Sequence, residues 1–127
     1  MCPGTRKKIL IVDADRVQCQ KLCDMVSAWH YVAVPVHNLD GVAVHFHDGD
    51  FIAVVLDIDS ITVDNRTIGR LAKAHPDVCL FCVSENRFHP ELQEAIGSHF
   101  FACLSKPVDP DELSYWLNSI SENDDPA

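Results

Sequence analysis

The stretch FIAVVLD occupies residues 51–57 of this 127-residue sequence. It runs through consecutive apolar residues and then ends at an acidic one, Asp57. A continuous apolar run of this length is typical of a β-strand that is buried on both of its faces, and such strands occur in parallel sheets covered by helices on both sides. The stretch therefore predicts an α/β fold with a carboxylate at the end of a buried strand.

Other apolar runs repeat the same pattern along the chain. They cover residues 9–12, 31–36, 78–83 and 100–104. Segments of helical length follow the runs, over residues 15–29, 39–46, 64–74, 90–97 and 110–120. This alternation predicts a five-stranded parallel sheet with helices on both faces and right-handed crossovers. Pro35 lies inside the second run and favours an edge position for that strand.

The composition is that of a single globular domain. Hydrophobic residues make up 47% of the chain and charged residues 23%, the ordinary balance for such a protein. The formal net charge of −9 argues against direct nucleic-acid binding. No apolar stretch approaches the roughly 20 residues of a membrane span, so we expect a cytoplasmic protein without membrane contact. We assign residues 7–121 to the domain and residues 122–127 to an acidic, disordered tail.

Polar residues follow the apolar runs at the points where the strands should end. Asp13, Asp57, Ser84 and Lys106 each come directly or almost directly after a run. In open α/β sheets, sites form outside the carboxyl ends of the strands, so we expect these four side chains to meet at one edge. Paired carboxylates favour a divalent cation such as Mg²⁺, and a carboxylate can attack phosphorus while an ammonium and a hydroxyl stabilise the transferred group.

Four segments carry a family resemblance. KILIVDAD, VVLDID, FCVS and CLSKPVDPDEL, at residues 8–15, 54–59, 81–84 and 103–113, resemble the response-regulator receiver domain in order and spacing. The resemblance extends from Lys8 to about Ile120. It implies a flavodoxin-like (βα)5 fold with strand order 2-1-3-4-5. It also implies a switch in two-component signalling that performs only its own phosphorylation and dephosphorylation chemistry, and is not otherwise an enzyme.

The resemblance also implies roles for individual residues. Asp57 matches the phosphoacceptor, Ser84 the switch hydroxyl, and Lys106 the lysine that stabilises the phosphoryl charge. A cis peptide bond is implied before Pro107.

A metal site is part of the same resemblance. Mg²⁺ would be held by Asp13, Asp57 and the backbone carbonyl of Asp59. Ala14 replaces one of the two adjacent acids that the family usually has, which affects the expected Mg²⁺ affinity. Asp15 either substitutes as a metal ligand or caps the following helix.

The resemblance implies partners as well. A sensor histidine kinase or a phosphotransfer protein would donate the phosphoryl group. A downstream effector would bind the face made by the fourth helix, the fifth strand and the fifth helix.

Several positions depart from the family pattern and leave the function open. Ser60 and Ile61 replace a Met-Pro pair, Glu85 replaces a small residue, and Cys103 replaces an aromatic one. Two alternatives follow: a phosphoaccepting switch, or a phosphorylation-independent pseudo-receiver that acts as an interaction module.

The six cysteines suggest a third, more distant function. Cys79 and Cys82 form a CxxC sequence, the pattern of a thioredoxin-like oxidoreductase. However, they lie inside an apolar run, where residues three apart point to opposite faces of a strand. Redox CxxC pairs sit at a helix N-terminus instead, so we expect these cysteines to be small buried side chains in a reducing compartment.

Overall fold

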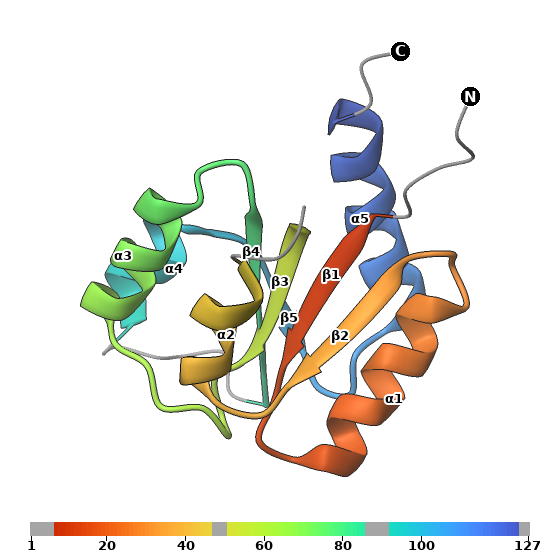
Figure 1. The fold of residues 1–127 in the computed structure, drawn as a ribbon, viewed down its shortest axis with the longest axis horizontal. Coiled ribbons are helices and arrows are strands. Elements are labelled where there is room, and N and C mark those ends of the chain that lie inside the picture. Colours follow the sequence, from red (N-terminus) through yellow and green to blue (C-terminus); the bar gives the residue numbers. More distant parts are fainter. Residues whose placement is uncertain (1–6, 47–50, 86–91, 125–127) are drawn as a thin grey trace.

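The computed structural model describes residues 7–46, 51–85 and 92–124, and within them it contains a parallel sheet flanked by helices (Figure 1). The strands are β1 (Lys8–Val12), β2 (Val32–Val36), β3 (Phe51–Asp57), β4 (Cys79–Ser84) and β5 (Phe100–Ser105). The helices are α1 (Arg16–Ser27), α2 (Leu39–Phe46), α3 (Asn65–Ala74), α4 (Gln93–Ser98) and α5 (Pro110–Asp124). The sheet order is β2-β1-β3-β4-β5 with every neighbouring pair parallel, so the expected flavodoxin-like topology is confirmed.

The two faces of the sheet carry separate hydrophobic clusters. Successive side chains of a strand point to opposite faces, so Ile9 and Ile11 of β1 pack with α1 and α5. Leu10 and Val12 pack on the opposite face, with α2, α3 and α4. Figure 1 shows this division, with α1 and α5 on one side of the sheet and the other three helices on the other. Both faces of the central strands are therefore buried under helices, as their continuous apolar sequences predict.

Strand β2 lies at one edge of the sheet, as Pro35 predicts. Pro35 is in register with Ile11 of β1. A proline cannot donate a backbone hydrogen bond, and an edge strand leaves half of its backbone groups without a strand partner. The position therefore accommodates the proline without loss of a ladder hydrogen bond.

The helix ends agree with the sequence at some points and differ at others. Asp15 caps α1 and Asp64 caps α3, each through a carboxylate that accepts backbone N–H groups of the first turn. Helix α5 ends at Asp124 and not at the expected Ile120, so residues 122–124 are helical and are not part of a disordered tail. The remaining tail residues and the expected helix start at Pro90 lie outside the described residues.

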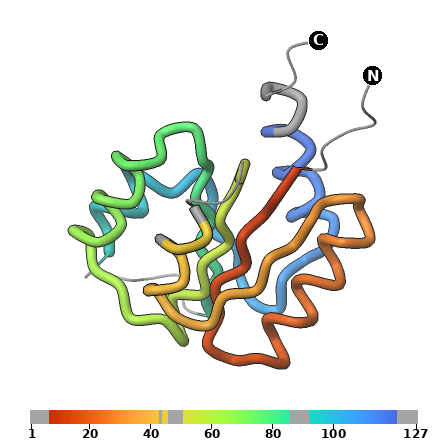
Figure 2. The backbone as a smooth tube through the Cα atoms, in the orientation of Figure 1, coloured from red at the N-terminus to blue at the C-terminus, as the bar shows by residue number. Residues whose placement is uncertain are grey.

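The carboxyl ends of the strands define one rim of the molecule. The backbone in Figure 2 enters β1 and leaves α5 at one end of the sheet, whereas the loops after β1 and β3 lie at the opposite end. Within the described residues, no helix combines the length and the apolar character that crossing a membrane requires.

Two chemically identical substitutions in α1 test the packing. Val26 is fully buried and Val17 is 67% exposed. Val26→Ala removes two buried methyl groups and leaves a cavity, and we expect it to lower the free energy of unfolding by about 2 kcal/mol more than Val17→Ala. Urea denaturation of both variants measures the difference. Equal stabilities would contradict the assignment of the buried face.

Candidate functional site

Three polar side chains are buried at the carboxyl rim. Asp13 follows β1, Asp57 ends β3 and Ser84 ends β4, and their exposed fractions are 0%, 1% and 5%. Burial of a carboxylate is unfavourable unless it is paired or hydrogen-bonded, so these positions require partners. The structure brings Lys106, which follows β5, to the same place, and the expected convergence of the four residues is therefore found.

Lys106 pairs with two carboxylates. Its Nζ lies 2.6 Å from Asp57 Oδ2 and 3.1 Å from Asp59 Oδ2. Burial alone would lower the pKa of Lys106, but the two carboxylates outweigh this effect, and the pKa is raised above its ordinary value. The ammonium therefore stays charged beside Asp57. The peptide bond between Lys106 and Pro107 is cis, as expected.

The loop after β3 fixes the orientation of Asp57. Asp57 Oδ1 accepts hydrogen bonds from the backbone N–H groups of Asp59 and Ser60, at 2.8 and 3.2 Å. This arrangement leaves the other oxygen, Oδ2, directed at Lys106 and at the side chain of Gln18.

Gln18 joins the two buried acids. Its Nε2 donates to Asp13 Oδ2 and to Asp57 Oδ2 from the first turn of α1. Burial raises the pKa of Asp13, the nearby charge of Asp57 adds to the rise, and the hydrogen bonds from Gln18 and the Asp15 N–H oppose it. The Gln18 amide thus donates a hydrogen bond to each carboxylate, which partly offsets the repulsion between them.

Ser60 connects the loops that follow β1 and β3. Its Oγ donates to Asp13 Oδ1 and accepts from the Ala14 N–H, both at 3.0 Å. Asp13 Oδ1 also accepts from the Asp15 N–H at 2.9 Å. Both oxygens of the Asp13 carboxylate therefore accept hydrogen bonds.

Asp59 contributes its carboxylate as well as its backbone. Its Oδ1 accepts from Ser84 Oγ at 2.7 Å, and its Oδ2 accepts from the Glu85 N–H at 2.8 Å. Burial would raise the pKa of Asp59, but the hydrogen bonds from Glu85, Ser84 and Lys106 together lower it. The carboxylate of Asp59 thereby links the switch-hydroxyl candidate on β4 to the lysine after β5.

Asp15 caps α1, one of the two alternatives for this residue. Its Oδ1 accepts from the N–H groups of Val17 and Gln18, at 3.0 and 3.2 Å. No group of three or more His, Cys, Asp or Glu side chains is arranged to hold a metal within the part of the chain that the structure describes. Any metal site here would therefore depend on two carboxylates and backbone or solvent oxygens.

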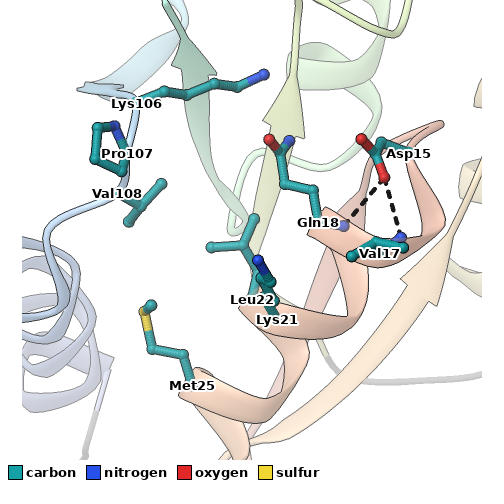
Figure 3. Close-up of a pocket in the computed structure, with 9 residues that line it drawn as sticks. All are labelled: Asp15, Val17, Gln18, Lys21, Leu22, Met25, Lys106, Pro107 and Val108. Atoms are coloured by element: carbon teal, nitrogen blue, oxygen red, sulfur yellow. Dashed lines mark hydrogen bonds between the residues drawn. The ribbon is translucent and has the colours of Figure 1, made fainter.

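A pocket of about 360 Å³ includes in its lining Gln18 and Lys106, which contact the buried acids. Its lining residues are Asp15, Val17, Gln18, Lys21, Leu22, Met25, Lys106, Pro107 and Val108. Figure 3 shows the three residues that follow β5 across the pocket from those of α1, with Lys106 extended toward the Gln18 amide. Two cations, Lys21 and Lys106, line this pocket, and Lys106 also contacts Asp57, so the pocket favours an anionic group next to a residue of the site.

Comparison with known proteins finds similarity in structure only. No protein-family model matches the sequence, and no curated protein matches it. The signal receiver domain of an HD domain-containing protein from Pseudomonas fluorescens Pf-5 is 21% identical, with a TM-score of 0.82 over 94% of this chain and 97% of that one. A CheY-like receiver domain from Methanospirillum hungatei JF-1 is 18% identical, with a TM-score of 0.81 over 94% and 98%. The chain has the receiver-domain fold.

A third similar structure is that of the BeF3-activated DrrB receiver domain. It is 15% identical, with a TM-score of 0.75 over 93% of this chain and 99% of that chain. Identities this low establish the shared fold, whereas the chemistry must be argued from the site itself.

Sequence reasoning missed three contributors to the site of this receiver fold. They are Gln18, the hydroxyl of Ser60 and the carboxylate of Asp59. Asp59 and Ser60 follow Asp57 so closely that their location at the rim could have been expected. Gln18 lies in the first turn of α1, at the spacing from Asp15 that a capping box would use, so the sequence favours a different role for its amide.

Asp13→Asn should stabilise the metal-free protein at neutral pH. The folded-state pKa of Asp13 is raised, so its favourable contribution exists below the unfolded pKa and is lost as the pH rises through the folded pKa. At neutral pH the buried charge is unfavourable, and the neutral amide removes it. Urea denaturation with a chelator present should show a gap between variant and wild type that shrinks as the pH falls to about 4.

Asp64→Asn is the matched control. The pKa of this exposed cap is lowered, first by the backbone hydrogen bond from Thr67, so its contribution is present above the unfolded pKa and lost at low pH. This variant should be no more stable than the wild type at neutral pH. A gain at Asp64 equal to that at Asp13 would contradict the burial argument.

Proposed function

We propose that this domain is a receiver of two-component signalling that accepts a phosphoryl group on Asp57 and changes conformation in response. The observation that carries the proposal is the buried Asp57 carboxylate with Lys106 Nζ 2.6 Å from its Oδ2. It lies at the carboxyl rim of a receiver fold, where Asp13 and Ser84 are also buried. A structural ion pair alone would not require two further buried polar groups at that point.

The chemistry of the site follows from these contacts. A carboxylate oxygen of Asp57 would attack the phosphorus of the donor, and the bond from phosphorus to the donor's leaving atom would break. Negative charge is spread over the equatorial oxygens of the transferred group. Lys106 would compensate this charge, because its ammonium already lies against Asp57, and the Ser84 hydroxyl would donate a hydrogen bond once it leaves Asp59.

The residues present fit a Mg²⁺ ion. Asp13 and Asp57 each turn one oxygen toward the same Gln18 nitrogen, so the two oxygens lie close enough to share one small cation. Mg²⁺ takes oxygen ligands and keeps several waters, and the backbone carbonyl of Asp59 would complete the protein's share. The ion would supply positive charge for the phosphoryl oxygens, and the Gln18 amide would have to leave the two carboxylates.

Gln18→Ala therefore tests the metal proposal. We expect Mg²⁺ to bind about fivefold more tightly to the variant, because the ion no longer displaces a hydrogen-bonding amide with a net contribution of about 1 kcal/mol. Gln20→Ala is the matched control, since Gln20 lies on the exposed side of the same helix and bonds Asp24. Isothermal titration calorimetry measures both affinities. Unchanged or weaker binding by Gln18→Ala would contradict a cation site between the two acids.

Phosphorylation is tested directly by mass spectrometry. With Mg²⁺ and acetyl phosphate, the wild type should gain one phosphoryl group, Asp57→Asn should gain none, and Asp24→Asn, an exposed control, should behave as the wild type. Lys106→Ala should slow the reaction about 100-fold, because it removes the charge nearest to the attacked group. An adduct that persists in Asp57→Asn would place the acceptor elsewhere.

A phosphorylation-independent interaction module is the second candidate. It is favoured by the Gln18 amide, which satisfies both buried acids without a cation, and by Ala14, where the resembled family has a second acid. This candidate predicts neither a phosphoryl adduct nor a spectral change with Mg²⁺ and beryllofluoride, the activating ligand of the similar DrrB receiver domain.

The partners follow from the same proposal. A sensor histidine kinase or a phosphotransfer protein in the cytoplasm would present its phosphoryl group at the pocket between α1 and residues 106–108. An effector would bind the α4-β5-α5 face, where Phe101 and Tyr115 are 43% and 65% exposed and both pack edge-to-face on Trp116. Exposed aromatic side chains of this kind are enriched at protein interfaces.

A further inference from the structure

Two cysteines lie side by side on neighbouring strands near the candidate site. Cys82 of β4 and Cys103 of β5 are register partners, and each thiol shifts the pKa of the other. Cys82 belongs to the hydrophobic cluster on the α2-α3-α4 side of the sheet. Ala102 and Leu104 pack in the cluster on the opposite side, so Cys103 between them turns toward the same side as Cys82.

The backbone places this pair at a spacing that a disulfide can span. Neighbouring strands lie about 4.7–4.9 Å apart, and disulfide-bonded residues have Cα atoms about 4.4–6.8 Å apart. Register partners that point to the same face need no shift of the sheet register to be joined.

The two thiols differ in access and in acidity. Cys103 is exposed, whereas Cys82 is only 2% exposed. The mutual influence of the two thiols lowers the pKa of Cys103 and raises that of Cys82, and burial raises the pKa of Cys82 further. An accessible, more acidic thiol next to a protected one is the arrangement of an oxidation-sensitive cysteine and its resolving partner.

We propose that Cys82 and Cys103 form a reversible redox site that closes to a disulfide on reaction with a peroxide. Cys103 attacks one peroxide oxygen, and the O–O bond breaks. With hydrogen peroxide this yields a sulfenic acid and one water. The Cys82 sulfur then attacks the Cys103 sulfur, the S–O bond breaks, and a second water leaves with the Cys82 proton. Both thiols are oxidised, the peroxide is reduced to water, and a dithiol reverses the reaction.

The location of the pair allows its oxidation to affect the residues at the rim. Cys82 lies two residues before Ser84, and Cys103 three residues before Lys106. A covalent link between β4 and β5 at this level would restrict the relative movement of the strands that carry both groups. The redox site itself does not depend on phosphorylation of Asp57.

Other cysteines of the chain provide internal comparisons. Cys19 and Cys23 are one helical turn apart in α1, but both are buried and the pKa of each is raised, that of Cys23 to about 12. Cys79 packs on the opposite face of β4 from Cys82, so these two do not form the CxxC redox pair considered from the sequence. Neither of these pairs places an exposed thiol beside a buried one on the same face.

Peptide mapping of the whole chain tests the proposal. The protein is treated with hydrogen peroxide, its remaining thiols are alkylated, and the digest is analysed by mass spectrometry. We expect a peptide pair cross-linked through Cys82 and Cys103 that is lost on treatment with dithiothreitol. Protection of these two thiols should develop at least tenfold faster than protection of Cys19 and Cys23.

Two variants make the outcome decisive. In Cys82→Ala the resolving thiol is gone, so Cys103 should accumulate as a sulfenic acid that dimedone traps. Cys79→Ala, on the same strand, should cross-link as the wild type does. The proposal is overturned if Cys82 and Cys103 stay fully alkylatable after oxidation, or if the cross-link joins Cys79, the Cys19–Cys23 pair or Cys2. Because the wild-type map is the primary measurement, poor folding of a variant does not remove the test.

Discussion

The carboxylates of Asp13 and Asp57 are buried at one edge of the sheet. Most of the hydrogen bonds and ion pairs at the rim stabilise their negative charge. Like charges at short range in a low-dielectric setting repel strongly, and each also loses its hydration. Lys106 provides the positive charge, Gln18 provides a donor to both acids, and backbone N–H groups of the two following loops bind the remaining oxygens. The contacts with these two carboxylates thus hold the loops after β1, β3 and β5 together.

This compensation has a consequence for any ligand. A cation or a phosphoryl group entering the rim meets acids whose oxygens already have partners, so binding must exchange one set of contacts for another. The side chains of Gln18 and Ser84 are the simplest to release, because each is a neutral donor. Whether the domain acts as a phosphoaccepting switch or as an interaction module therefore depends on how the free energy of these exchanges compares with that of the new contacts.

Strands β4 and β5 connect the rim to two other features of the molecule. Ser84 ends one strand, Lys106 follows the other, and the register partners Cys82 and Cys103 lie two residues before the ends of the strands. On the other face, Phe101 of β5 packs against Trp116 of α5 and leaves part of its ring exposed. The thiol of Cys103 stands where the resembled family has an aromatic residue, and its register partner on β4 is a second cysteine, Cys82.

The sequence by itself determined the fold class, the strand order implied by the resemblance, the edge position of β2 and the four residues at the rim. Apolar runs that end in polar residues depend only on local periodicity, and the carboxyl ends of parallel strands must share an edge. Only the tertiary structure decided that Gln18 bridges the acids, that the Asp59 carboxylate binds Ser84 and Lys106, and that Cys82 is the register partner of Cys103. These contacts join residues far apart in the chain, and they depend on strand register and on the rotation of α1 about its axis, which the period of a sequence does not encode.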